Sequence, residues 1–184
     1  MDTAVQKSGG VMSAADEIVT IVDEHNQVIG AVPRREMRAK RLLHRSTYIL
    51  VFNSQGHLYV QKRTMTKDVF PGYYDAAAGG VVLAGESYEA GAARELAEEM
   101  GIQDVPLTQH FEFYFADDHN RVWGKAFSCV YDGDIVLQEE EVESGAFVPV
   151  NEILCRAHTE PFTPDGLYVL RRYLDLTAAP LSPP

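Results

Sequence analysis

Three glutamates crowd negative charge into one turn of a predicted helix, at positions Glu95, Glu98 and Glu99. At about 100° per residue, their carboxylates share one helix face. On an exposed helix this costs only about 0.2 to 0.5 kcal/mol per pair, but two carboxylates about 4 Å apart in a cleft repel by about 4 kcal/mol. In a cleft they would need protons or a cation, and their hard oxygens suit Mg²⁺ or Mn²⁺. The cluster therefore predicts a divalent-metal site, with an exposed acidic face as the alternative.

The residues around the three glutamates have types that would position them. Arg94 and Glu86 can pair and hold the preceding loop against the helix, because a guanidinium binds a carboxylate in bidentate geometry. We assign both to the catalytic machinery. Gly80 lets the backbone approach a metal, since it has no Cβ. Ser87 is the predicted N-cap and Gly101 the predicted left-handed stop, so the helix is expected between them.

The complete spacing is Gly80, five residues, Glu86, seven residues, Arg94-Glu95-Leu96, one residue, Glu98-Glu99, one residue and Gly101-Ile102. It resembles the signature of the Nudix hydrolase family, G-x5-E-x7-R-E-U-x-E-E-x-G-U with U apolar, and all nine specified positions match. At about 7% usage for each of the seven fixed residues, the probability of a chance match at one starting position is about one in 10⁸. The resemblance is therefore specific.

The resemblance implies an α+β fold, a Nudix-type α/β/α sandwich with a mixed β-sheet, here with an N-terminal β-hairpin extension. It implies a hydrolase that uses Mg²⁺ or Mn²⁺ to cleave a diphosphate linkage in a small molecule, with a nucleoside diphosphate derivative as the expected substrate. A homodimer is expected on the same ground. By resemblance, Glu98 and Glu99 are metal ligands and Gly80 contributes its carbonyl. Glu95 and Glu98 are the expected catalytic carboxylates, Glu95 as a metal ligand or a general base.

A further metal ligand is implied in a loop near the last strands, where the sequence LQEEEVESGAFVPVNEI offers several carboxylates. Glu141 and Glu140 are the first candidates, with Glu143 behind them, and an exposed acidic loop is the alternative. Lys62 and Arg63 end a predicted strand that leads toward the signature. They are predicted phosphate contacts, with ordinary strand-end charges as the alternative.

The stretch TYILVFNSQGHLYVQKRTMTKDVFPGYYDAAAGG before the signature resembles the branch that contains the isopentenyl diphosphate isomerases. Those enzymes move protons with a cysteine just before the signature and a later glutamate. In this chain the cysteine position falls at Gly79, the next histidine of that motif at Val81, and the later glutamates near 120–123. His44 matches one isomerase histidine but is expected to be an ordinary hydrogen-bonded residue. We therefore predict a hydrolase, with an isomerase and a non-catalytic nucleotide sensor as alternatives.

Length and charge limit the remaining possibilities. The 184 residues suit one Nudix domain at 17–176, with disordered ends at 1–16 and 177–184. The net charge of −11 argues against a nucleic-acid partner, which requires a basic face. There is neither a long apolar window nor a signal-peptide start, so we expect a cytoplasmic protein without a membrane partner. Basic residues concentrate at 34–67 and predict a local anion-attracting surface.

The order of the predicted elements fits a mixed sheet covered by helices. Alternating and apolar runs predict strands, and capping residues predict helices. Besides the signature helix, the elements expected are two hairpins at 17–32 and 47–63, strands at 111–116, 122–132 and 145–150, and helices at 34–42, 150–158 and from Thr163 onward.

Overall fold

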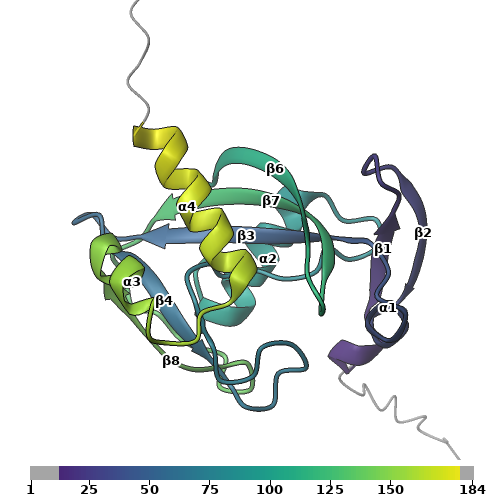
Figure 1. Ribbon diagram of the computed structural model, residues 1–184, viewed down its shortest axis with the longest axis horizontal. Helices are drawn as coiled ribbons and strands as arrows, with labels where there is room; N and C mark the ends of the chain where they lie inside the picture. Colours follow the sequence, from purple (N-terminus) through teal and green to yellow (C-terminus); the bar gives the residue numbers. More distant parts are fainter. Residues whose placement is uncertain (1–12, 179–184) are drawn as a thin grey trace, which may run out of the picture.

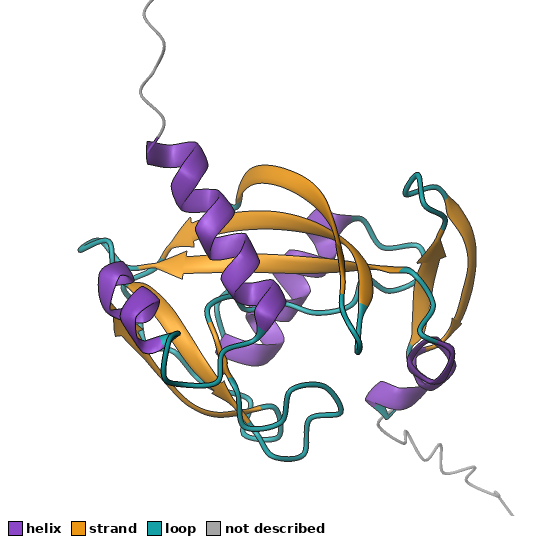
Figure 2. Ribbon diagram, viewed as in Figure 1, coloured by secondary structure: helices purple, strands orange, loops and turns teal. Residues whose placement is uncertain are grey.

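The computed structural model describes residues 13–178, which form a mixed β-sheet between two layers of helices (Figures 1 and 2). Helix α2 (Tyr88–Met100) covers one face of the sheet. Helices α3 (Val150–Arg156) and α4 (Pro164–Ala178) cover the other. The predicted α/β/α sandwich is confirmed.

Eight strands form the sheet, and the N-terminal hairpin carries two short helical segments beside it. The strands are β1 (Ile18–Val22), β2 (Val28–Pro33), β3 (His44–Phe52), β4 (Leu58–Arg63), β5 (Tyr74–Asp75), β6 (Thr108–Ala116), β7 (Arg121–Val130) and β8 (Val142–Val148). The helical segments are the 3₁₀ turn η1 (Ala14–Asp16) and α1 (Arg34–Lys40). Strands β3 and β7 run parallel along the whole of β3, whereas the other named strand pairs are antiparallel, so the sheet is mixed.

The predicted second hairpin, β3 and β4, holds together only at its turn. The two strands share the single pair Phe52↔Leu58 and then diverge, since β3 continues against β7 and β4 against β8. The chain before α2 enters the gap between them through the bridges Ile49↔Ala78 and Ser46↔Val81. Gly79 and Gly80 therefore lie in the middle of the sheet, between diverging strands.

Helix α2 begins and ends where its capping residues predict. The Ser87 hydroxyl accepts the Ala90 amide hydrogen bond at 3.1 Å, and Gly101 stops the helix at a φ of 67°. Its buried residues Leu96 and Met100 pack in one core cluster that also contains Phe127 of β7. Each such side chain contributes about 1.5–3 kcal/mol when it is removed from water. Packing thus fixes the helix that carries the three glutamates.

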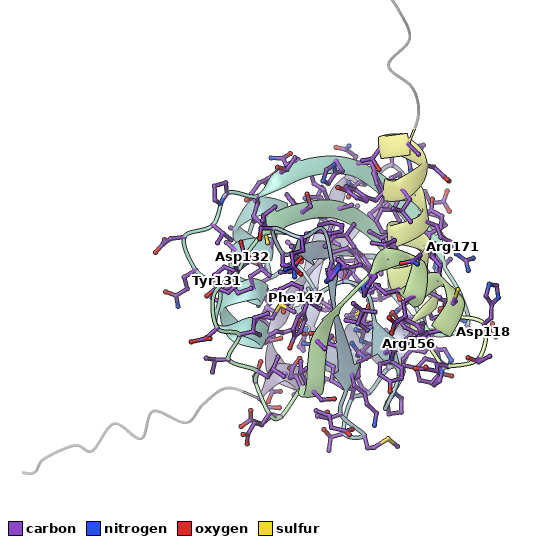
Figure 3. All side chains as sticks on the ribbon, turned by 90° about the vertical axis from the view of Figure 1, so that its left-hand side faces the viewer. Asp118, Tyr131, Asp132, Phe147, Arg156 and Arg171 are labelled. Carbon is purple, nitrogen blue, oxygen red and sulfur yellow. The ribbon has the colours of Figure 1, made fainter. Side chains whose placement is uncertain are left out.

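The opposite layer is held by α4 and α3. Val169 and Leu170 of α4 are fully buried in the second core cluster. Arg156, at the end of α3, places its guanidinium 4.8 Å from the ring centre of Tyr74. These contacts join α3 and α4 to the sheet. Phe147 of β8, labelled in Figure 3, belongs to the core on the α2 side, where it packs edge-on against Tyr59 with ring centres 5.1 Å apart.

The domain limits differ slightly from those predicted. Residues 14–16, expected to be disordered, form η1 because Ser13 caps the turn and Asp16 forms an ion pair with Arg35 of α1. Helix α4 continues to Ala178, two positions beyond the predicted limit at 176. The rest of the two segments expected to be disordered, 1–12 and 179–184, lies outside the described residues. No helix between residues 13 and 178 is long and apolar enough to cross a membrane.

Candidate active site

A cavity of about 590 Å³, here called the outer cavity, lies beside α2. It brings two of the signature glutamates, Glu95 and Glu98, together with Glu140 and Glu141 of the late loop. Gly80 lines the same cavity. The structure thus gathers carboxylates from two segments that are far apart in the sequence.

Glu95 lies at the edge of the outer cavity, with 9% of its surface exposed. Burial and the nearby charge of Glu99 raise the pKa of the Glu95 carboxyl to about 8. A Cβ at Gly80 would lie 2.6 Å from Glu95 Oε1, closer than any side chain tolerates. Glycine at this position therefore lets the backbone approach the Glu95 carboxylate.

Arg94 connects Glu86, in the loop before α2, to Glu95 and Glu98 on the helix. Its Nε and Nη2 donate to the two oxygens of Glu86 at 2.9 and 3.1 Å, and Nη2 also donates to the Val81 carbonyl at 3.1 Å. Its Nη1 donates to Glu95 Oε1 at 2.8 Å and to Glu98 Oε2 at 2.9 Å. The predicted ion pair with Glu86 is confirmed, and one guanidinium orients three carboxylates.

Glu99 lies deeper than the other two signature glutamates. It is 2% exposed, and its Oε2 accepts hydrogen bonds from the Gly79 amide at 3.1 Å and the Gln61 side chain at 3.4 Å. Burial raises the pKa of its carboxyl. Helical spacing explains the difference: from Glu95, Glu98 turns toward solvent and Glu99 toward the sheet. The three glutamates lie along one side of the helix, but their exposure decreases from Glu98, which is exposed, through Glu95 to the fully buried Glu99.

The late loop contributes Glu140 and Glu141 to the outer cavity, whereas Glu143 lies elsewhere. Glu143 Oε1 accepts from Lys62 Nζ at 2.9 Å, and neither residue lines the outer cavity. Glu141 forms an ion pair with Lys67. Across residues 13–178, no three His, Cys, Asp or Glu side chains converge closely enough to hold a metal as they stand. In this arrangement, arginine and lysine partners hold the carboxylates.

The two predicted phosphate contacts separate because adjacent strand residues point to opposite faces. Lys62 points toward Glu143, while Arg63 donates to the Val69 carbonyl at 2.9 Å and lies 3.7 Å from Asp75. Sequence reasoning missed Arg34 and Lys67, which line the outer cavity. The concentration of basic residues at 34–67 could have pointed to them. Which of these residues reach the cavity depends on how the N-terminal hairpin packs against the signature segment.

A second cavity, here called the inner cavity, lies behind Gly79 and Gly80 and has a volume of about 70 Å³. It contains Asp75 and Asp165, which no sequence pattern marks. Burial and the charge of Asp165 raise the pKa of Asp75 to about 7. Tyr48 donates its hydroxyl hydrogen to Asp165 Oδ2 at 2.9 Å.

The buried carboxyl of Asp75 makes stability depend on pH. Because its folded pKa of about 7 exceeds the ordinary value of 3.8, the native state keeps a proton that the unfolded chain has lost. This contribution to the free energy of unfolding therefore falls as pH rises from about 4 to about 7. Between about pH 5 and pH 8, we expect the free energy of unfolding of Asp75→Asn to fall by about 1–3 kcal/mol less than that of the wild type, measured by urea unfolding. Asp175→Asn, an exposed change on α4, is the control, and equal pH dependence in both variants would contradict the prediction.

His44 is a buried, hydrogen-bonded residue, as the sequence predicts. Its Nδ1 lies 2.9 Å from the Leu42 carbonyl, and burial together with the charge of Arg38 lowers its pKa to about 3. The ring is therefore neutral at ordinary pH.

Comparison with known proteins decides the family. The sequence profile described as the NUDIX domain matches residues 42–173, which include the whole signature and both cavity-lining aspartates. The chain belongs to the Nudix family. The matched region begins just before β3, and the β1–β2 hairpin with α1 precedes it in the chain.

Related Nudix proteins match nearly the whole chain. An uncharacterized Nudix hydrolase of Pseudomonas aeruginosa is 47% identical over 159 residues, 86% of this chain and 94% of the relative. The uncharacterized Nudix hydrolase YfcD of Escherichia coli is 47% identical over 165 residues, 90% of this chain and 91% of the relative. The assignment as a Nudix hydrolase, acting on phosphoanhydride bonds, is confirmed.

Solved structures show the same fold. A crystal structure from Deinococcus radiodurans superposes with a TM-score of 0.75 at 25% identity, covering 85% of this chain and 98% of that one. The NUDIX domain of Shewanella oneidensis NrtR, crystallised with ADP ribose, has a TM-score of 0.59 at 16% identity, covering 79% and 99%. The latter likeness shows the fold alone.

Proposed function

We propose that this Nudix hydrolase is a divalent-metal-dependent pyrophosphohydrolase that cleaves the diphosphate linkage of a nucleoside diphosphate derivative by attack of water at phosphorus. One observation carries the proposal: the complete signature folds so that Glu95 and Glu98 line one cavity with Glu140, Glu141 and three cations, Arg34, Lys67 and Arg94.

The residues present fit a divalent cation. The outer cavity offers hard carboxylate oxygens, the ligand type that Mg²⁺ and Mn²⁺ take. A Cβ at Gly80 would lie 2.6 Å from Glu95 Oε1, and burial and the charge of Glu99 raise the pKa of Glu95, an effect that a bound cation would oppose. Glu95, Glu98 and Glu99 would hold the metal, with Glu141 from the late loop and the Gly80 carbonyl. That carbonyl accepts the Thr47 amide at 2.9 Å and, more weakly, the Thr47 hydroxyl at 3.4 Å, which a bound cation would displace.

When bound, the metal would neutralise the diphosphate and lower the pKa of a coordinated water. The protein residues have separate roles. Glu95, with a pKa raised to about 8, holds a proton near neutral pH in the metal-free protein; a bound cation would lower that pKa, and the ionised carboxylate could then accept a proton from attacking water. Arg94 holds the Glu95 carboxylate in orientation. Arg34 and Lys67 line the outer cavity as cations and would bind phosphate oxygens.

Isomerisation is disfavoured by the backbone at Gly79. Its φ of 132° suits glycine, and a Cβ there would lie 2.3 Å from the Thr47 carbonyl oxygen. A cysteine at this position would need a rearranged strand, so the site has no thiol and no room for one.

The proposal is tested by incubating the protein with nucleoside diphosphates, their sugar and dinucleotide conjugates, coenzyme A and isopentenyl diphosphate, with Mg²⁺ or Mn²⁺. We expect release of phosphate products from at least one conjugate, abolished by a chelator and restored by added metal. The isomerase alternative predicts an isomeric product from isopentenyl diphosphate. Saturable nucleotide binding without any product would replace the hydrolase with the sensor.

A further inference from the structure

The inner cavity has no role in the proposed hydrolysis, yet it joins the outer cavity. The backbone of Gly79 and Gly80 lines both, as do the cations Arg34 and Lys67. The part of the inner cavity that lies away from these four shared residues is here called the inner wall. Its polar residues include His44, Asp75, Thr163 and Asp165, which do not line the outer cavity. A molecule held by its phosphates in the outer cavity can therefore extend past the two glycines toward this wall.

His44 presents a hydrogen-bond acceptor without a partner. Its ring is 2% exposed, and its Nδ1 lies 2.9 Å from the Leu42 carbonyl oxygen. Because that carbonyl only accepts, Nδ1 carries the hydrogen and Nε2 keeps its lone pair. Nε2 is buried and has no hydrogen-bond partner among the described residues. A buried unpaired acceptor costs about 1–3 kcal/mol, which a ligand's donor would offset.

The two aspartates add further acceptors on the same wall. Asp75 Oδ1 accepts the Ala77 amide at 3.2 Å, and Asp165 Oδ1 accepts the Gly166 amide at 3.1 Å. Tyr48 donates to Asp165 Oδ2. Asp75 Oδ2 also lies 3.7 Å from Arg63, and because Asp75 keeps a proton up to about pH 7 it can donate as well as accept. The wall is therefore matched to a group that donates hydrogen bonds to His44 and Asp165 and can also accept one, as a hydroxyl does.

Charge and size decide what kind of donor fits. The three guanidinium groups of Arg34, Arg38 and Arg63 line the inner cavity and would repel an ammonium group. The carboxyls of Asp75 and Asp165 would repel a phosphate at the inner wall. The volume of about 70 Å³ admits only a compact group. A neutral group with several hydroxyls meets all three conditions.

We propose that the inner cavity is a subsite for a compact, neutral, hydroxyl-bearing group attached to the diphosphate, the chemistry of a sugar or polyol, with His44, Asp75 and Asp165 accepting its hydroxyl hydrogens. This inference rests on the proposed function, because the phosphates in the outer cavity anchor the ligand.

The kinetic test compares matched substrates. ADP-ribose and UDP-glucose are each compared with the methyl ester of the same nucleoside diphosphate, which has the same charge but no hydroxyl beyond the diphosphate. We expect at least one sugar conjugate to exceed its ester in kcat/KM by about tenfold or more, and Asp165→Asn to lower that ratio by about tenfold. Asp175→Asn, an exposed aspartate on the same helix, is the matched control. Equal kcat/KM for conjugate and ester, or an unchanged ratio in Asp165→Asn, would overturn the subsite.

A binding test separates this inference from the hydrolase proposal and needs no turnover. The amides of Ala77 and Gly166 hydrogen-bond to the two aspartates, so their NMR resonances report on the inner wall of the wild-type protein. We expect a sugar conjugate, titrated with Ca²⁺, to shift both resonances more than its methyl ester does. Equal or absent shifts at saturation would overturn the subsite. If no compound is hydrolysed but the selective shifts appear, the proposed function fails and the subsite stands.

Discussion

Glu99→Gln is expected to abolish turnover and at the same time to stabilise the metal-free protein. Glu99 is fully buried, and its charge raises the pKa of Glu95. Removing that charge weakens the proposed metal site, for which we expect a loss of roughly 100-fold or more in kcat/KM. It also ends the repulsion of Glu95, so the free energy of unfolding at pH 8 without metal should rise by about 1 kcal/mol. The substituted amide side chain keeps an oxygen that can accept the Gly79 amide hydrogen.

The two effects are measured by substrate hydrolysis with Mg²⁺ and by urea unfolding in a chelator. Glu143→Gln is the matched control, because this carboxylate pairs with Lys62 outside the cavities, and its activity should stay within about twofold of wild type. Activity in Glu99→Gln equal to wild type would remove this helix from the mechanism. A less stable metal-free Glu99→Gln would show that the glutamate serves the fold.

Arg94→Lys should produce the largest loss of stability. Arg94 forms ion pairs with Glu86, Glu95 and Glu98, and also donates to the Val81 carbonyl. A lysine cannot reproduce the planar fork, so two partly buried carboxylates lose hydrogen bonds. Breaking such a network typically costs about 3–5 kcal/mol, and we expect about 3 kcal/mol here because one positive charge remains.

The measurement is urea unfolding at pH 7 together with kcat/KM at a temperature where the variant is folded. Arg35→Lys is the control, since Arg35 forms an ion pair with Asp16 in which both side chains are exposed. Its cost should be about 0.5 kcal/mol. Similar costs in both variants would mean that the Arg94 network contributes no more than a surface ion pair.

The sequence by itself determined the signature helix and the family. Ser87 and Gly101 specify the ends of α2 through local hydrogen bonding and φ, which need no distant residue. The pairing of Arg94 with Glu86 was also predictable, because the spacing fits a loop folded back on a helix. These features depend on neighbours within one segment of the chain.

Only the tertiary structure decided which charges meet in the two cavities. Lys62 is turned away from the face of Arg63 by strand alternation, and Glu143 follows it at a register shift in β8, so the two pair with each other outside the two cavities. The divergence of β3 and β4 is set by their pairing with β7 and β8, strands more than 60 residues away. It places the two glycines between the cavities and brings Asp75 beside Asp165. Such contacts join residues remote in sequence, and their partners are chosen by packing, which no local spacing records.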